Sequence, residues 1–315
     1  MDITISERQE KHSVWESYHP KRVSYILPTK NRAELLEKSL LLLRDIVKPQ
    51  DELIIIDGGS YDNTRDVVER HRDFVDMFVS EPDGPGHATN KGILFARGRY
   101  IKHLADDELI SPDGIEQAIG VLDAHPEIDL LVCGSTVYLT GETKPSYIYV
   151  PPGAHYGTHP DDILRFWTGS GDCFIIRRSL FAKVGIFSST VVNDYEFIAR
   201  CLFLKANVKF CRINLMENRA TRGGLTYRKR VEALREKKEI TKKYCSRLAY
   251  YLYCLEKNAF MRRTRLSLFA RPIFRFTVDF RKKGVLGLIH DFQNKFIRKG
   301  LRRASEAPIW DGGLS

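Results

Sequence analysis

The chain lacks the features that would place it in a membrane, in an oxidising compartment or among the repeat proteins. No apolar run approaches the roughly 18 residues that a membrane-spanning helix needs, and there are no internal repeats or low-complexity tracts. The six cysteines are scattered, mostly within apolar segments, and form no CxxC pair, which indicates reduced structural thiols and no zinc site. The N-terminal residues are polar and of mixed charge, so we expect no signal peptide and a cytoplasmic location.

The charge of the chain is unevenly distributed. The 315 residues carry a formal net charge of +10. Residues 221–315 hold 24 Lys and Arg against 8 Asp and Glu, whereas the residues before them hold 26 basic and 32 acidic residues. A change of sign within one chain predicts a slightly acidic body joined to a basic region that contacts an anionic partner.

Apolar runs alternate with helical patterns through the first half of the chain. The run LIII at 53–56 is continuously apolar, as in a strand that is covered on both faces of its sheet. The expected strands are 23–27, 53–56, 77–79, 99–105, 129–139, 171–178 and 208–213, and the expected helices are 34–46, 64–68, 86–96, 112–122 and 193–203. This alternation predicts an α/β fold with a mostly parallel, Rossmann-like sheet flanked by helices, followed by a helical and basic tail.

Three adjacent acids, Asp106, Asp107 and Glu108, follow the strand expected at 99–105. Ligands of open α/β sheets bind beyond the carboxyl ends of the strands, and adjacent carboxylates repel one another unless a cation lies among them. Magnesium is usually held by one or two carboxylates together with substrate phosphates. One hypothesis is therefore a metal–diphosphate site, and the alternative is an acidic turn before a helix that begins at 111–112.

Six motifs occur in order along the chain. They are IIIDGGSYDNT (54–64), SEPDGPGHATNKGI (80–93), YIKHLADDELISPDGI (100–115), GDCFIIRRSLFAKVGIF (171–187), NDYEF (193–197) and RGGLT (222–226). In order and spacing they resemble the inverting family-2 glycosyltransferases, which have the GT-A fold. The resemblance implies a GT-A domain at 1–226, with a nucleotide-sugar half near 23–139 and an acceptor half near 140–226. A basic helical C-terminal region follows at 227–315.

The resemblance implies roles for residues on the donor side. Pro28 and Thr29 match the family loop that lies along the nucleotide. Asp57 matches the acid that contacts the nucleoside, and its alternative role is a turn acid that accepts hydrogen bonds from backbone amides. The commoner family pattern has two adjacent acids here, and Gly58 stands in place of the second.

Further donor-side roles follow from the same resemblance. Asp83 matches a position near the nucleotide crevice, and Lys91 a charge that offsets phosphate, with a surface position on a helix as the alternative for Lys91. Asp106 is implied to contact the ribose, and Asp107 to bind the Mg²⁺ or Mn²⁺ that bridges the diphosphate. The position two before Asp106, often Asp or Asn in relatives, is Leu104.

Asp194 stands at the family position of the catalytic base. Such a carboxylate must lie within hydrogen-bond reach of the acceptor hydroxyl and have a pKa suited to taking its proton. Glu196 is the competing candidate, with a solvated acid at a helix start as its alternative role. Four histidines match no metal-ligand spacing and are expected to be non-ligands: His87, His103, His155 and His159.

The resemblance implies transfer of one sugar from a nucleotide-diphosphate sugar, expected to be a UDP-sugar, to an acceptor hydroxyl with inversion. It also implies a surface-polysaccharide or lipopolysaccharide pathway with a growing or lipid-linked glycan as acceptor. A sugar nucleotidyltransferase is the rival enzyme, but the Gly-rich loop it needs is replaced by PTKNR. A basic nucleic-acid-binding protein is the rival from another class, but the tail contains no recognised binding module, so we expect no nucleic acid partner.

The basic tail contains an amphipathic pattern. Val285, Ile289, Phe292 and Phe296 recur at helical spacing, and basic residues crowd the same stretch. An interfacial helix that lies among lipid headgroups has this pattern, so we expect peripheral contact with the inner face of the cell membrane. The alternative is that these helices pack on the catalytic domain or on a second subunit of a homo-oligomer.

Overall fold

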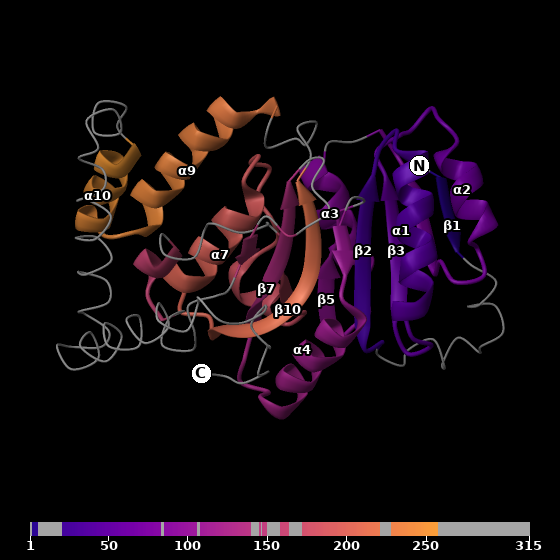
Figure 1. Cartoon of the computed structure of the whole chain (residues 1–315), viewed down its shortest axis with the longest axis horizontal. Helices are drawn as coiled ribbons and strands as arrows, with labels where there is room; N and C mark the ends of the chain where they lie inside the picture. Colours follow the sequence, from indigo (N-terminus) through magenta and orange to yellow (C-terminus); the bar gives the residue numbers. More distant parts are fainter. Residues whose placement is uncertain are drawn as a thin grey trace.

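The computed structural model describes residues 2–5, 21–82, 85–105, 108–139, 145, 147–149, 158–163, 172–220 and 228–257. Within these ranges, ten strands form one sheet with helices on both of its faces (Figure 1). The strands are β1 (Asp2–Ile5), β2 (Val23–Thr29), β3 (Glu52–Asp57), β4 (Met77–Ser80), β5 (Tyr100–His103), β6 (Glu108–Ile110), β7 (Leu130–Leu139), β8 (Tyr147–Tyr149), β9 (Phe174–Arg177) and β10 (Val208–Ala220). The helices are α1 (Ala33–Ile46), α2 (Thr64–Arg70), α3 (Pro85–Phe95), α4 (Pro112–Ala124), α6 (Leu180–Val184), α7 (Asn193–Phe203), α9 (Arg230–Tyr244) and α10 (Arg247–Lys257).

The sheet is mixed. Its strand order is β1-β4-β3-β2-β5-β9-β7-β10-β6, with β8 paired to β7. Strands β4, β3, β2 and β5 are parallel neighbours, as are β7 and β10, whereas the other pairs are antiparallel. The expected α/β fold is confirmed, but the parallel arrangement holds only for β4, β3, β2 and β5 and for the pair β7 and β10. A short connection accounts for one antiparallel pair: β8 begins at Tyr147, soon after its neighbour β7 ends at Leu139, and a parallel neighbour needs a crossover of about a dozen residues or more.

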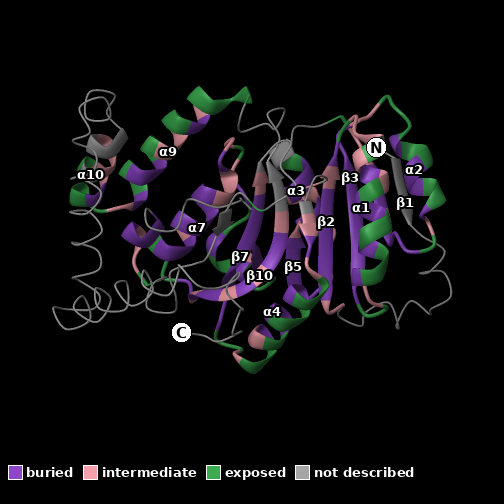
Figure 2. Cartoon of the chain, in the orientation of Figure 1, coloured by how far each residue is buried: buried purple, intermediate pink, exposed green. Residues whose placement is uncertain are grey.

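Two hydrophobic cores lie on opposite faces of the sheet, because successive residues of a strand point to opposite sides. In β3, Leu53 and Ile55 belong to one core, and Ile54 and Ile56 belong to the other. The first core is covered by α1, α2 and α4, and the second by α3, α6, α7 and α9. Figure 2 shows buried strands between helices whose outer sides are exposed. The continuous apolar run at 53–56 therefore reflects burial on both faces.

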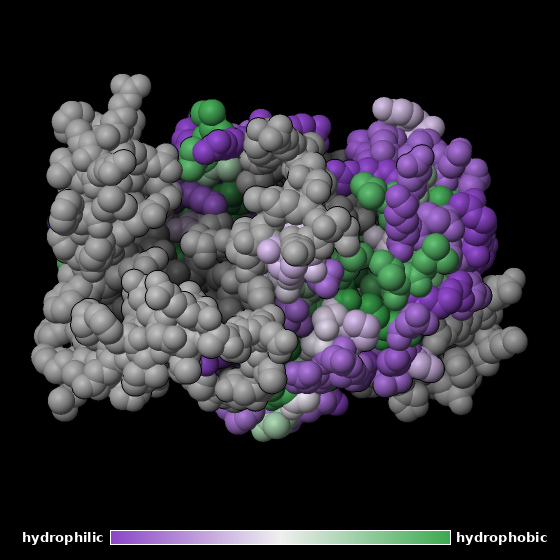
Figure 3. Space-filling view, viewed as in Figure 1, coloured by the Kyte–Doolittle hydropathy of each residue, from purple (hydrophilic) through white to green (hydrophobic). Residues whose placement is uncertain are grey.

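Helix α1 shows how the sequence sets the packing. Leu36, Leu40 and Leu43 recur at three- and four-residue spacing and are buried, whereas Leu41 and Leu42 are exposed. An apolar stripe of this kind packs one side of a helix on the sheet. On the face that Figure 3 shows, the described surface around α1 and α2 is largely hydrophilic, with smaller hydrophobic areas. The helix expected at 34–46 is confirmed.

Helices α9 and α10 lie at the opposite end of the molecule from β1 (Figure 1). Helix α9 packs on α7, and the Glu236 carboxylate of α9 accepts hydrogen bonds from the N–H groups of Val191 at 2.8 Å and Val192 at 3.3 Å, just before α7. Among the described helices, none has the length and apolar content needed to cross a bilayer. The amphipathic pattern expected from Val285 onward lies outside the described residues.

Candidate active site

The carboxyl ends of β2 and β3 bring the expected donor-side residues together. Thr29 and Asp57 are register partners at the ends of these two strands, and Pro28 precedes Thr29. Strand β5, the other parallel neighbour of β2, ends at the same edge of the sheet. Because ligands of open α/β sheets bind beyond such strand ends, this edge is the candidate nucleotide site.

Asp57 is 3% exposed, and its carboxylate accepts hydrogen bonds from neutral donors. The Ser60 N–H donates to it at 3.0 Å, the Ser60 hydroxyl at 2.5 Å and the Ser80 hydroxyl at 2.7 Å. Gly59 has a φ of 77°, which L side chains rarely adopt, and a Cβ there would lie 3.0 Å from the Cα of Pro82. The turn role considered for Asp57 is therefore present, and the same contacts hold the carboxylate at the strand end.

Helix α3 carries two polar residues that make defined contacts. Lys91 forms an ion pair with Glu81, the residue after β4. The Asn90 side chain donates to the Phe187 carbonyl at 2.8 Å and accepts from the Phe187 N–H at 3.0 Å. The positive charge expected near phosphate is thus paired with a carboxylate here, and Asn90 fixes the segment that leads into α7.

Asp194 lies in the first turn of α7 and is half-buried. Its carboxylate accepts the Tyr195 N–H at 2.7 Å, and its own N–H donates to the Asn193 side chain at 2.7 Å. Burial raises the pKa of Asp194 to about 7, and the negative charge of Asp172 adds to the rise. The Tyr195 N–H and the positive charge of Lys237 act in the opposite direction. A carboxylate with this pKa is suited to accept a proton near neutral pH.

Glu196, the competing candidate, has structural partners. It is 7% exposed and accepts hydrogen bonds from the Arg200 guanidinium at 2.8 Å and from the Tyr244 hydroxyl at 2.7 Å. Arg200 also donates to the Ile186 carbonyl at 2.8 Å. Glu196 therefore ties α7 to α9 and to the loop before α7, and the solvated role considered for it does not apply.

Asp172 is a site residue that the sequence analysis missed. Its carboxylate lies 2.9 Å from Nδ1 of His103, the last residue of β5. Burial raises the pKa of Asp172, but the charge and hydrogen bond of His103 and the charge of Lys102 outweigh it, so the net pKa lies below the ordinary value. The antiparallel pairing of β5 with β9 is what brings Asp172 to the end of β5.

Three expected site residues lie outside the described residues: Asp83, Asp106 and Asp107. In the sequence, Asp106 and Asp107 fall between the end of β5 and the start of β6. Within the part of the chain that the structure describes, no three His, Cys, Asp or Glu side chains gather in a way that could hold a metal ion. Carboxylate oxygens are nevertheless the donors that Mg²⁺ and Mn²⁺ prefer, so the chemistry of this acidic pair fits the expected metal.

The fold agrees with comparisons to known proteins, which define a class of glycosyltransferases with the GT-A fold. The solved structure of residues 1–349 of TarS from Staphylococcus aureus, in complex with UDP-GlcNAc, has a TM-score of 0.55 at 16% identity and covers 93% of this chain and 95% of that one. A mannosyltransferase from Pyrobaculum calidifontis, in complex with GDP-Man and Mn²⁺, has a TM-score of 0.51 at 16% identity, with 92% and 77% covered. At these identities the likeness shows the fold alone.

The family follows from the sequence match. The model described as Glycosyl transferase family 2 matches residues 24–185, slightly more than half of the chain, and the chain belongs to this family. An uncharacterized glycosyltransferase of Rickettsia typhi is 27% identical over 190 residues, which cover 59% of each chain. The match therefore spans less than two thirds of that relative. The family and the GT-A fold expected from the six motifs are confirmed.

Proposed function

We propose that the protein transfers one sugar from a nucleotide-diphosphate sugar to an acceptor hydroxyl and inverts the anomeric centre. The observation that carries the proposal is Asp194, a half-buried carboxylate in the first turn of α7 with a pKa of about 7. Asp194 accepts the proton of the acceptor hydroxyl. The acceptor oxygen then attacks the anomeric carbon from the face opposite the departing nucleotide, so a single displacement inverts that centre.

The donor is bound at the carboxyl ends of β2, β3 and β5. Pro28 and Thr29 lie along the nucleotide, Asp57 contacts the nucleoside, and Asp106 contacts the ribose. Asp83 and Lys91 complete this side. Lys91 forms an ion pair with Glu81 and also supplies positive charge near the diphosphate. A UDP-sugar is the donor we expect, since the TarS structure that shares this fold holds UDP-GlcNAc.

Asp107 is the residue that would hold Mg²⁺ or Mn²⁺. When bound, a divalent cation stabilises the negative charge that develops on a departing diphosphate. Support comes from the carboxylate donors of the acidic pair and from the mannosyltransferase with this fold, whose structure contains Mn²⁺.

The acceptor is proposed to be a growing or lipid-linked glycan of a surface polysaccharide or lipopolysaccharide. TarS, a poly(ribitol-phosphate) β-N-acetylglucosaminyltransferase, is 27% identical to this chain over 117 residues and supports that choice. We also propose that the basic region after 226 brings the enzyme to the inner face of the cell membrane. Association through a second subunit is the alternative for that region.

The test combines donor binding with transfer. A thermal-shift screen of UDP-sugars and GDP-sugars with Mn²⁺ identifies the donor, because a ligand that binds the folded state raises apparent stability. Transfer from that donor to a panel of simple glycosides is then followed, with the anomeric configuration of the product determined by NMR. We expect an inverted product, loss of transfer in EDTA, and loss of about 10²–10⁴ in rate for Asp194→Asn with donor binding retained.

Glu196→Gln is the matched control, because it changes a carboxylate two positions away on the same helix turn. Its partners Arg200 and Tyr244 are structural, so we expect lower stability with transfer retained per folded molecule. Full transfer by Asp194→Asn together with an inactive, folded Glu196→Gln would show that the base is the other carboxylate. A product of retained configuration would exclude the single displacement.

A further inference from the structure

A partly buried pair of side chains, His103 and Asp172, lies near enough to Asp194 for its charges to act on that carboxyl, and the function proposed above does not use it. Nδ1 of His103 and a carboxylate oxygen of Asp172 are 2.9 Å apart, and their side chains are 12% and 16% exposed. The Thr89 hydroxyl, from α3, lies 3.0 Å from Nε2 of His103. Both ring nitrogens therefore have a partner, and the imidazole is held in one orientation against the carboxylate.

The backbone around this pair is fixed by a second group. Lys102 is 0% exposed, and its ammonium donates to the His103 carbonyl at 2.7 Å and to the Asp172 carbonyl. The Phe174 N–H also donates to the Asp172 carbonyl, at 2.8 Å. A buried ammonium is costly unless it is hydrogen-bonded, so these contacts tie the end of β5 to the start of β9. The position of the His103–Asp172 pair is set by the sheet.

Aromatic packing connects the pair to the helix that carries Asp194. The His103 ring contacts the Phe187 ring with centroids 6.1 Å apart, and Phe187 packs on Phe197 of α7 at 4.5 Å. Asn90 holds the backbone of Phe187 on both its N–H and its carbonyl. The site thus contains two carboxylates, Asp172 and Asp194, on elements that are packed together.

The two carboxylates have opposite environments. The pKa of Asp172 is lowered by His103 and Lys102 in spite of burial, whereas burial and the negative charge of Asp172 raise the pKa of Asp194. Lys237, from α9, and His103 act on Asp194 in the opposite direction to Asp172. Carboxylates in one site whose pKa values are pushed apart commonly divide the acid and base roles between them.

We propose that His103 and Asp172 are positioning residues for the transfer reaction, and that the negative charge they hold in place acts on Asp194 while Asp194 removes the acceptor proton. This inference rests on the proposed function. Asp172 does not touch the substrate in this account. It keeps a fixed negative charge near the base, His103 orients that charge, and the positive charge of Lys237 on α9 opposes its effect.

The experiment compares two variants of the full chain that change the charge around Asp194 in opposite senses. Asp172→Asn removes the negative neighbour, so the pKa of Asp194 falls, and the acidic limb of the kcat/KM profile should move to lower pH by about 0.5–1 unit. Lys237→Met removes the positive neighbour, so the same limb should move to higher pH. A role limited to folding would lower activity at every pH and leave the limb in place.

A second measurement does not depend on catalysis, and it does not require Asp172→Asn to be stable. Carbon-detected NMR of the Asp194 carboxyl, in the wild type and in Lys237→Met, reports the protonation of Asp194 directly, and the variant should titrate at higher pH. An unmoved limb in a folded Asp172→Asn, or shifts of the same sign in both variants, would overturn the inference. Those results leave the base assignment intact, whereas full activity in Asp194→Asn would overturn the proposed function itself.

Discussion

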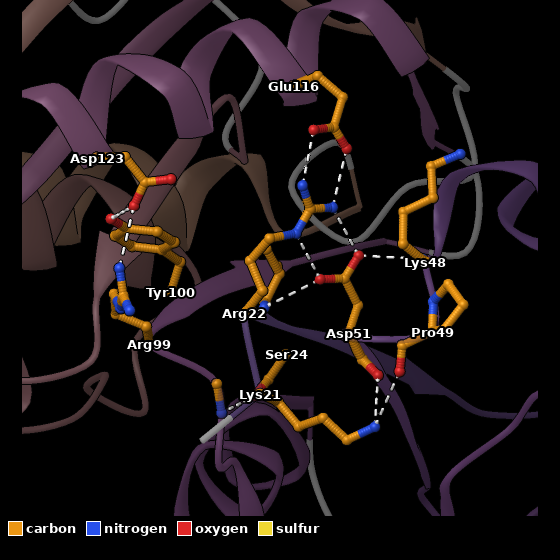
Figure 4. A network of polar contacts seen from close by, with 12 residues as sticks. Lys21, Arg22, Ser24, Lys48, Pro49, Asp51, Arg99, Tyr100, Glu116 and Asp123 are labelled. Atoms are coloured by element: carbon orange, nitrogen blue, oxygen red, sulfur yellow. Dashed lines mark hydrogen bonds and ion pairs between the residues drawn. The ribbon is translucent and has the colours of Figure 1, made fainter. Parts of the chain in front are cut away.

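At the amino end of the central strands, Arg22 lies between two carboxylates and donates to Asp51 at 2.8 Å and to Glu116 at 2.7 Å (Figure 4). At the carboxyl end of β3, Asp57 accepts hydrogen bonds from the Ser60 and Ser80 hydroxyls, and Asp194, in the first turn of α7, accepts one from the Tyr195 N–H. The Asp51 side chain is 0% exposed, so its charge is tolerated because Arg22 neutralises it. Opposite charges compensate one another around Asp51, whereas neutral donors hold the carboxylates of Asp57 and Asp194.

The two ends also differ in how their groups titrate. Hydrogen bonds to Asp51 and Glu116 raise the pKa of Arg22, and the hydrogen bond from Arg22 lowers the pKa of Glu116. Both effects stabilise the ionised forms. Burial instead raises the pKa of Asp194 to about 7, close to the pH at which it would work. The ion pairs of Arg22 therefore stabilise the fold, whereas Asp194 can exchange a proton near neutral pH.

Removing the Arg22 charge, which neutralises buried Asp51, should have the largest effect on stability. Arg22→Met leaves the Asp51 charge buried and unpaired, which should lower the free energy of unfolding by about 2–4 kcal/mol, with some relief because Arg22 is partly exposed. Urea unfolding followed by circular dichroism measures this. Sugar transfer per folded molecule should not change, because the strand ends that are proposed to bind the donor lie at the opposite edge.

Arg44→Met is the matched control for Arg22→Met. Arg44 pairs with Asp73, but these side chains are 41% and 61% exposed, so solvent screens the pair. Its loss should change the free energy of unfolding by less than about 1 kcal/mol. Equal losses in the two variants would mean that burial of Asp51 does not decide the effect.

A smaller effect on stability is expected from Asp57→Ala. This change removes the acceptor of the Ser60 and Ser80 hydroxyls and should lower the free energy of unfolding by about 1–2 kcal/mol. It should also weaken donor binding in the thermal-shift assay, because Asp57 is proposed to contact the nucleoside. Ser80→Ala, which removes one of the hydroxyls, separates the two effects: it should lower stability while donor binding persists. Unchanged donor binding by Asp57→Ala would limit Asp57 to its turn.

The smallest effect is a gain in stability that depends on pH. An unfolded Asp titrates near ~3.9, whereas folded Asp194 titrates near about 7. Because the folded pKa is raised, the stability that protonated Asp194 contributes is complete below about pH 4 and is lost as the pH rises through about 7. Asp194→Asn cannot ionise, so its Tm should equal that of the wild type near pH 4.

At pH 8 the same variant should have a Tm higher by about 2–4 °C, which corresponds to roughly 1 kcal/mol after allowance for the partly exposed carboxylate. Differential scanning calorimetry across this pH range makes the comparison. A Tm lower than that of the wild type at pH 8 would show that ionised Asp194 is stabilised by its surroundings, and the contrast between the two ends of the sheet would then disappear.

The sequence predicts those parts of the fold that depend on local patterns. The leucine face at 34–46 and the apolar run at 53–56 predict α1 and β3. Burial of one face of a helix, or of both faces of a strand, requires apolar residues at regular positions along the sequence. Strands β1, β6 and β8 are not predicted, because their pairing with β4, β10 and β7 defines them. Strand β10 extends to Ala220, beyond the expected end at 213, through its pairing with β7 and β6.

The candidate site likewise contains residues that a local pattern predicts and one residue that it does not. Asp194 and Asp57 stand in recognisable motifs, so the sequence predicts them as site residues, and these assignments stay predictions. Asp172 gains its position only when β9 pairs with β5, and nothing local indicates that neighbour. The structural role of Glu196 does have a local signal, because Arg200 follows it at the i, i+4 spacing of a helical ion pair.

The contact between α9 and α7 bears on where the protein can be divided. The family match ends at residue 185 and the catalytic domain was expected to end at 226, but Glu236 holds the N–H groups that precede α7, and Tyr244 binds Glu196 within it. A shortened gene that stops at 185 would lack α7 and Asp194 altogether, and one that stops at 226 would keep α7, with the proposed base, but remove its contacts with α9. The modular unit, for expression or for domain exchange with relatives, therefore includes α9, although no family motif marks it.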